Sequence, residues 1–188
     1  MGPEGGRLAN LLGSLAVLMA AGAIAIGLPA LDRALPAARP VPADLPYEVG
    51  GGVSLMPPPG ALIDVTKTRP GRDRGTVLFL IGAVRFVIVA APFPGTLSEA
   101  TARLRSKITA TRGYQVAGPE SAVSTRGGLI GRGGGYAAPG RTGRYSVFLV
   151  VGMAIEVTVS GGRTDLSGAL AGVSASIDTL TYTDPSRP

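Results

Sequence analysis

The sequence predicts an α+β protein in which an N-terminal transmembrane helix precedes an antiparallel sheet with two helices. Two observations carry this prediction. A pattern of strand, turn, strand and helix occurs twice, about seventy residues apart, and an uncharged run of 24 residues lies near the N-terminus. Because neither hairpin of such a ββα–ββα arrangement is stable alone, we expect the helices to cover the apolar face of one shared sheet.

The uncharged run extends from Leu8 to Leu31. As an α-helix it would be roughly 36 Å long, longer than a bilayer hydrocarbon core of about 30 Å. A cleaved signal peptide is the alternative, since Ala23-Ile24-Ala25 offers a small-x-small cleavage site, but the apolar character continues to Leu31. A soluble helix would need a polar face, which this run lacks. We therefore expect an uncleaved membrane anchor, a single-pass signal-anchor.

Four further segments surround the predicted span. They are a short tail at 1–7, a Pro/Ala-rich stalk at 32–46, the folded domain at 47–183 and a disordered tail at 184–188. Four prolines among alanines make the stalk extended and semi-rigid. Positive charges on the two sides of the span are nearly balanced, so charge leaves its orientation open. A short N-terminal tail is typical of a signal anchor, which places the bulk of the chain outside the cytoplasm at the cell membrane.

The first predicted hairpin joins residues 76–81 to 84–89. Both runs are rich in β-branched and aromatic residues, and Gly82-Ala83 separates them. A helix follows, because Thr96 and Glu99 have the spacing of a capping box. Apolar residues then recur at spacings of three and four before Gly113 ends the helix, namely Leu97, Ala100, Leu104 and Ile108.

The second predicted hairpin joins residues 146–151 to 154–159 and aligns with the first without a gap when Gly152 is placed on Gly82. A second helix follows with Asp165 as its N-cap. Its apolar face consists of Leu166, Leu170, Val173, Ile177 and Leu180. The sequence leaves open whether this repeat is a duplication or the recurrence of a common motif.

Side-chain alternation predicts how these strands are covered. In 154–159 apolar residues alternate with Glu156 and Thr158, so this strand should have one face toward water. The strand at 84–89 is apolar except for Arg85 and should be central and covered on both faces. The sheet is expected to gain strands from Gly52–Met56, Ala61–Lys67 and parts of Gln115–Ala138. The core should include Phe79, Phe86 and Phe148.

The residue inventory argues against catalysis. The chain has neither histidine nor cysteine, which excludes Ser-His-Asp triads, imidazole and thiolate metal ligands, thiol nucleophiles and disulfides. Ser106 and Lys107 are adjacent on a predicted helix and so do not face each other as a dyad would. The carboxylates show no cation-binding spacing. We therefore expect no enzyme activity, no catalytic residues, no metal and no cofactor.

The glycine-rich segment Gly127 to Gly135 invites comparison with phosphate-binding loops. No Lys-Ser/Thr pair follows it, and its flanks have strand character, so neither a Walker loop nor a dinucleotide loop is predicted. We interpret these glycines as positions of strand turns, bulges or close backbone approaches.

Basic residues give the one positive indication of a partner. The chain has 18 Lys and Arg against 12 Asp and Glu. If the basic residues after Gly113 share a face with those of the first helix, that face would attract anionic lipid headgroups, acidic polymers or an acidic partner. The candidate contact residues are Arg103, Lys107, Arg126, Arg132, Arg141 and Arg144. Nucleic acid is not expected, because the basic stretch lacks interleaved aromatic residues.

The order of landmarks resembles a known family. A strand leads into Leu55-Met56-Pro57-Pro58-Pro59-Gly60-Ala61, and a hairpin leaves through Pro92-Phe93 into a capped helix before the glycine-rich middle. This order resembles the small PsbP-like α+β domains. Among single-pass actinobacterial membrane proteins it is similar to the family of the mycobacterial lipid-uptake coordinator LucA. The resemblance implies a non-catalytic accessory protein that binds and stabilises membrane import machinery, and it carries over no site residue.

Two functions therefore remain open. The first is a membrane-anchored, non-catalytic extracytoplasmic interaction domain, an accessory or stabilising subunit for envelope or lipid-transport machinery, whose partner is another envelope or membrane protein. The alternative is a cleaved, secreted or cell-wall-associated domain that binds a small amphiphile or an anionic polymer. An apolar pocket between sheet and helices would favour the ligand-binding alternative, and a filled core would favour the interaction domain.

Overall fold

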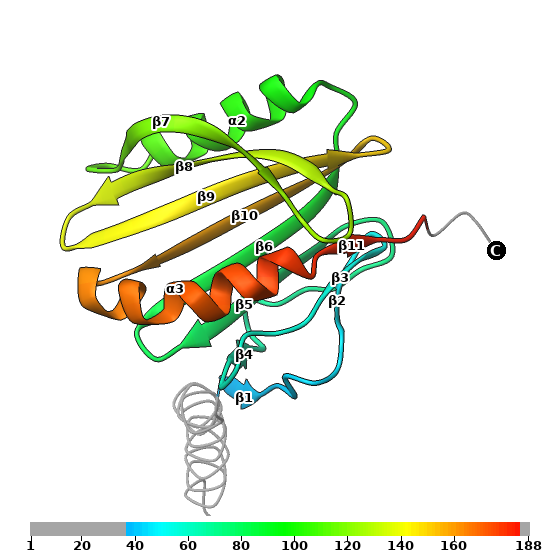
Figure 1. The fold of residues 1–188 in the computed structure, drawn as a ribbon, viewed down its shortest axis with the longest axis horizontal. Helices are drawn as coiled ribbons and strands as arrows, with labels where there is room; N and C mark the ends of the chain where they lie inside the picture. Colours follow the sequence, from blue (N-terminus) through cyan, green and yellow to red (C-terminus); the bar gives the residue numbers. More distant parts are fainter. Residues whose placement is uncertain (1–36, 185–188) are drawn as a thin grey trace, which may run out of the picture. The chain divides into compact units, whose positions relative to one another are not determined.

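The computed structural model describes residues 37–184, which form an α+β domain (Figure 1). The first strands are β1 (Ala38–Pro40), β2 (Tyr47–Gly50), β3 (Val53–Leu55), β4 (Leu62–Asp64), β5 (Gly75–Ile81) and β6 (Val84–Pro92). Helix α2 (Leu97–Thr109) follows, and then β7 (Gln115–Ser124), β8 (Ile130–Ala138), β9 (Arg141–Val150) and β10 (Met153–Gly161). Helix α3 (Arg163–Asp178) and β11 (Thr181–Tyr182) complete the described part.

Eight strands form one sheet in the order β1-β4-β5-β6-β10-β9-β8-β7, and each pair of neighbours is antiparallel. A smaller sheet has the order β11-β3-β2. The antiparallel α+β fold with two helices is confirmed for the described residues. The strand predicted at Gly52–Met56 exists as β3, but it belongs to the small sheet and not to the main one.

Both predicted hairpins are present, but they correspond differently from the gapless alignment. The last pairs before the turns are Ile81–Val84 and Val150–Met153, so the true offset is 69 residues and Val151 takes the place of Gly82. Val151 has a φ of 44° and Gly152 a φ of 73°, a combination typical of a type I′ turn. A one-residue slip exchanges the two faces of a strand. At the corrected offset the buried Phe79 corresponds to the buried Phe148, and both helices share the same offset.

The two helices begin differently. Helix α2 has the predicted capping box, in which the Thr96 hydroxyl accepts from the Glu99 backbone N–H and the Glu99 carboxylate accepts from the Thr96 backbone N–H. It ends at Thr109, before Gly113. The prediction of Asp165 as the N-cap of α3 is wrong, because the helix begins at Arg163 with Gly162 as its cap and Asp165 lies in the first turn.

The helices lie on opposite faces of the main sheet. Leu166 and Val173 of α3 pack in the larger core with Phe86 and Phe148, whereas α2 packs against Tyr145 and its neighbours. The small sheet adds Val49, Val53 and Leu55 to the α3 side, over β5 and β6. Figure 1 shows α3 in front of the strands and α2 at the β7 end of the sheet. The predicted core positions Phe79, Phe86 and Phe148 are confirmed, since each is fully buried.

The expected coverage of the two central strands is reversed. Glu156 and Ala154 of β10 are buried because α2 covers the face that was predicted to be wet. On β6, by contrast, Arg85, Val87 and Val89 are half-buried, so the strand predicted to be covered on both faces is fully covered on one. Residue polarity gave the wrong coverage, because Glu156 is buried beneath α2 together with the counter-charges of Lys107 and Arg103.

The N-terminal predictions have two outcomes. The predicted stalk at 32–46 is wrong in part, since Ala38–Pro40 pairs with Leu62–Asp64 as the edge strand of the main sheet. The predicted span Leu8 to Leu31 lies outside the described residues. Within 37–184, neither helix is both long and apolar enough to cross a bilayer.

Candidate functional site

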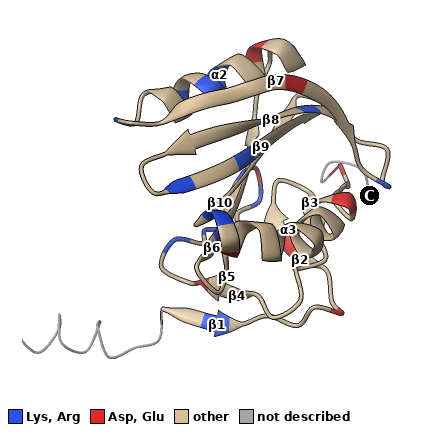
Figure 2. Cartoon of the chain, turned by 60° about the vertical axis from the view of Figure 1, so that its left-hand side comes forward, with Lys and Arg blue, Asp and Glu red and all other residues tan. Residues whose placement is uncertain are grey.

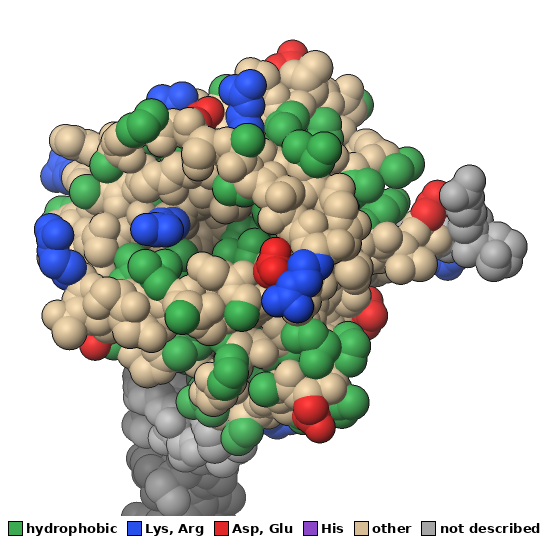
Figure 3. Space-filling model, in the orientation of Figure 1, with side chains coloured by type: hydrophobic (Ala, Val, Ile, Leu, Met, Phe, Trp, Pro, Cys, Tyr) green, Lys and Arg blue, Asp and Glu red, His purple; other side chains and the backbone are tan. Residues whose placement is uncertain are grey.

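A trough lies between α3 and the β7–β9 end of the sheet. Three adjacent hollows of about 450, 400 and 360 Å³ compose it, and Arg144 of β9 lines all three. Their size is in the range of small-molecule sites. Figure 3 shows this side of the molecule hollowed above α3. We call this hollow the α3 trough.

The floor of the α3 trough includes Gly133 and Gly135 of β8, and Gly131 lies on the same face of that strand, opposite Phe148 of β9. A Cβ at Gly131 would lie 2.6 Å from Cδ1 of Phe148, and one at Gly133 would lie 3.0 Å from the Tyr145 carbonyl oxygen. Because these glycines have no side chains, the neighbouring strand packs closely against β8 and the space above the strand stays empty. This confirms the interpretation of the glycine-rich segment as a place of close approach, here within a strand.

The walls of the trough carry a row of apolar side chains, with serines among them. Leu170 and Ile177 of α3 are half-buried on one side, and Val123 of β7 is half-buried on the other. Phe148 and Val173 lie beneath them in the core. Helix α3 is held in place at its C-terminal end, where the Thr125 hydroxyl donates to the Leu180 carbonyl (3.3 Å) and the Arg126 backbone N–H donates to the Asp178 carbonyl (2.9 Å).

The charge in the trough is positive and unbalanced. Arg144 lies between Gly135 of β8 and Val159 of β10 in the strand register, and its exposed side chain makes no ion pair or hydrogen bond within residues 37–184. Arg163, exposed at the start of α3, lines the hollow of about 450 Å³ beside it. The acid that lines the trough is Asp178, and Arg126 neutralises it at 2.7 Å.

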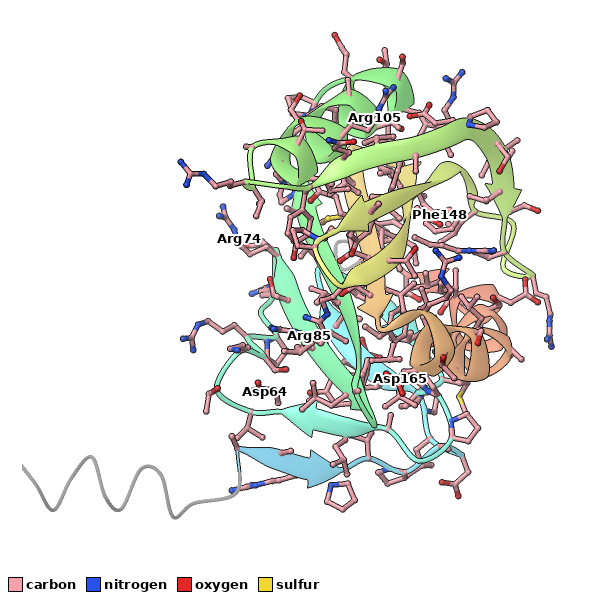
Figure 4. The ribbon with its side chains drawn as sticks, turned by 90° about the vertical axis from the view of Figure 1, so that its left-hand side faces the viewer. Asp64, Arg74, Arg85, Arg105, Phe148 and Asp165 are labelled. Atoms are coloured by element: carbon pink, nitrogen blue, oxygen red, sulfur yellow. The ribbon has the colours of Figure 1, made fainter. Side chains whose placement is uncertain are left out.

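The opposite face of the sheet is closed by ion pairs. The Lys107 Nζ donates to both carboxylate oxygens of Glu156, at 2.8 and 2.7 Å, and Arg103 Nε lies 4.0 Å from the same carboxylate. Lys107 therefore holds α2 against β10. Figure 4 shows Arg105 on α2 and Phe148 on the side of the sheet toward α3.

A second cluster on the α2 face surrounds Glu120. Its carboxylate accepts from the Tyr145 hydroxyl at 3.0 Å and lies 3.3 Å from Arg105 and 3.9 Å from Arg132. Burial, with the hydrogen bond to Glu120 as a further cause, raises the pKa of Tyr145 to about 12. Through Glu120, this cluster links β7 to Tyr145 of β9 and to Arg105 of α2.

The six predicted contact residues do not form one continuous face. Arg103, Lys107 and Arg132 serve the ion pairs of the α2 face. Arg126 is paired with Asp178, and Arg141 donates to the Ala83 carbonyl at 3.4 Å. Of the six, Arg144 is the one placed inside the α3 trough. Figure 2 shows the basic residues spread over α2, β8 and β9.

Two trough residues were not among those predicted from the sequence. Leu170 was predicted on the apolar face of a helix and Arg163 lay before its predicted N-cap, but nothing in the sequence indicated an opening beside this helix. The usable signal lay in the glycines, because Gly131, Gly133 and Gly135 recur at a spacing of two and so empty one face of a strand. No cluster of three carboxylates that could hold a metal ion occurs in residues 37–184.

Comparison with solved structures places the fold. The domain is similar to the solution structure of cyanobacterial PsbP (CyanoP) from Synechocystis sp. PCC 6803, with a TM-score of 0.51 and 17% identity over 71% of this chain and 88% of that one. The fold is PsbP-like. A more distant similarity is to LpqN, a protein involved in cell envelope biogenesis of Mycobacterium tuberculosis, with a TM-score of 0.42 and 15% identity over 77% of this chain and 81% of that one. Neither a family model nor a curated protein matches the chain.

The PsbP-like fold agrees with the resemblance drawn from the proline and glycine landmarks. It concerns the fold of the described domain and assigns no ligand or partner. The narrower similarity to the LucA family remains a prediction.

Proposed function

We propose that the chain is a membrane-anchored, single-pass protein whose PsbP-like domain lies outside the cytoplasm and acts by binding, as an accessory or stabilising subunit of envelope or lipid-transport machinery. The α3 trough is the observation that carries the binding role, because it combines an apolar wall with an arginine that has no partner within the described residues. The uncharged run from Leu8 to Leu31 supports the anchor.

The engagement of the carboxylates also supports a binding role over a catalytic one. Glu99 closes the capping box of α2, Glu156 holds Lys107, Glu120 holds Tyr145 and Asp178 holds Arg126. Thr66 donates from its hydroxyl to Asp64 and lowers the pKa of that carboxyl. These acids stabilise turns, helix ends and strand contacts, so none of them is placed as a paired general acid and base.

The alternative function is a cleaved domain, secreted or wall-associated, that binds a small amphiphile or an anionic polymer. The α3 trough is the feature expected of this ligand-binding alternative, whereas the anchored function rests on the uncharged run and would use the trough as its binding surface. The two functions differ in what they require of the mature N-terminus.

Intact-mass measurement after cell fractionation distinguishes them. The full chain with a C-terminal tag should appear in the membrane fraction at its full-length mass, and external protease should degrade the domain in spheroplasts. A mature species that begins near Ile26 in the soluble or wall fraction would contradict the anchored function and support the cleaved alternative.

A further inference from the structure

We infer that the α3 trough binds a single-chain anionic amphiphile, with its carboxylate or phosphate at Arg144 and its hydrocarbon chain along α3 toward Val123 and Ile177. This goes beyond the proposed function, because it names a ligand class and a binding orientation, and it holds wherever the mature chain begins.

The charge distribution fixes the position of the head group. Arg144 lies where the three hollows meet, and Arg163 lines the hollow toward the start of α3. Asp178, at the other end of the trough, is neutralised by Arg126 at 2.7 Å. An arginine presents planar pairs of N–H donors that suit carboxylate and phosphate oxygens. An anion is therefore best placed between Arg144 and Arg163.

The apolar lining fixes the direction of the chain. From Arg144 toward the end of α3, the trough is lined by Val123 on one side and by Leu170 and Ile177 on the other. From residue 166 to residue 178 the helix rises about 18 Å, which is close to the extended length of a long acyl chain such as palmitoyl. Burial of a chain against these half-buried side chains removes apolar surface from water on both partners.

The hydrogen-bonding state of the floor argues against a peptide ligand. Strand β8 is paired with β7 on one side and with β9 on the other, so its backbone groups are engaged. A peptide laid in the trough would leave its own backbone groups without partners, which is costly in an apolar groove. An acidic polymer would need a row of cations, but the trough offers Arg144 and Arg163 at one end and neutral walls beyond.

Photolabelling of the full-length chain in phosphatidylcholine nanodiscs tests this inference. The probe is a palmitate analogue that carries a diazirine near its methyl end, and its methyl ester is the uncharged control. After trypsin digestion, label from the acid is expected in the peptides 113–126 and 164–188, which contain Val123 and α3. Label that fragment-ion analysis assigns to the α2 part of the peptide 86–103, residues 97–103, would place the ligand on the wrong face and overturn the inference.

Two variants with matched controls sharpen the test. Arg144→Gln removes the cation, and Arg112→Gln removes one exposed arginine outside the trough. Ser174→Phe places a ring in the trough from an exposed position on α3, and Ser106→Phe does the same on the exposed surface of α2. Labelling should fall about tenfold in R144Q, as expected for the loss of one charged contact, and by a similar factor in S174F, whose ring occupies the trough. It should stay within about twofold of wild type in both controls.

Competition identifies the head group. Unlabelled palmitate or lysophosphatidic acid should reduce the label, and whichever competes better shows whether a carboxylate or a phosphate is preferred. Equal competition by neutral monopalmitin, equal labelling by the methyl ester, or undiminished labelling of R144Q would each overturn the inference. Fractionation reports on the anchor and photolabelling on the trough, so failure of one is distinct from failure of the other.

Discussion

The two faces of the main sheet differ at the β7–β9 end, because one face is closed by α2 and the other is open. On the α2 face, Glu156 and Tyr145 are buried beneath the helix and paired with residues of α2 or β7. On the α3 face, glycines on β8 and an arginine without a partner in residues 37–184 leave the β7–β9 end open. Buried polar residues lie on the closed α2 face, and glycines without side chains leave the α3 face open. In this domain, therefore, the polarity of a residue does not indicate whether it is exposed.

The two halves of the chain show how this difference arises. Each half supplies a hairpin and a helix at an offset of 69 residues, yet α2 and α3 pack on opposite faces. The small sheet occupies the α3 side over β5 and β6, where a symmetric α2 would lie. Because α2 instead covers β7 to β10, the α2 face is less covered at β5 and β6, and the α3 face is less covered at β7 to β9.

The largest effect is expected from crowding the close contact between β8 and β9 at Gly131. Gly131→Val would place side-chain atoms where the Phe148 ring and the Val147 carbonyl lie, and should lower the free energy of unfolding by about 3 kcal/mol through overpacking. Urea denaturation followed by circular dichroism measures the change. Unaltered stability would mean that β8 and β9 do not pack closely at this point.

A smaller loss is expected from opening the ion pairs of the α2 face. Glu156→Gln keeps the shape of the side chain but removes the charge that Lys107 contacts, and should cost about 2 kcal/mol of unfolding free energy. Arg144→Gln is the matched control on the other face and should change stability by less than about 0.5 kcal/mol. Equal losses in both variants would contradict the contrast between a closed and an open face.

Tyr145→Phe should cost about 1 kcal/mol near neutral pH, because it removes the hydrogen bond to Glu120. The pKa of Tyr145 is raised to about 12 in the folded chain, from an ordinary value of 10.0. Its contribution is therefore fully present below pH 10 and is lost as the pH rises toward 12. Unfolding curves measured across this range should converge for wild type and Y145F, and a constant difference would contradict the assignment.

The smallest effect is a gain. Gly168 lies in α3 at a position where an added Cβ would have no neighbouring atom within 4 Å, so Gly168→Ala should stabilise the protein by about 0.5–1 kcal/mol through helix propensity. Gly131→Ala is the matched contrast, since the same methyl group there meets Phe148 and should destabilise. Thermal melts of the two variants should shift in opposite directions, and a shift of both in one direction would refute the difference between open and crowded glycines.

The sequence by itself determined the local elements. The hairpins, the capping box of α2 and the apolar face of α3 follow from residue types and spacings, because turns, caps and periodicity are set within a few residues. The close approach at the glycine-rich segment was also predictable, since Gly131, Gly133 and Gly135 recur on one face of a strand. These predictions were sufficient for an α+β domain with an antiparallel sheet.

Only the tertiary structure decided what each face became. Glu156 looked solvent-exposed in sequence, and its burial required Lys107, 49 residues away in the chain. The separation of Arg144 from the other basic residues likewise depended on α2 and α3 packing on opposite sides. Periodicity predicts that a helix has an apolar face but not which side of a sheet receives it, because that choice depends on what the rest of the chain already covers.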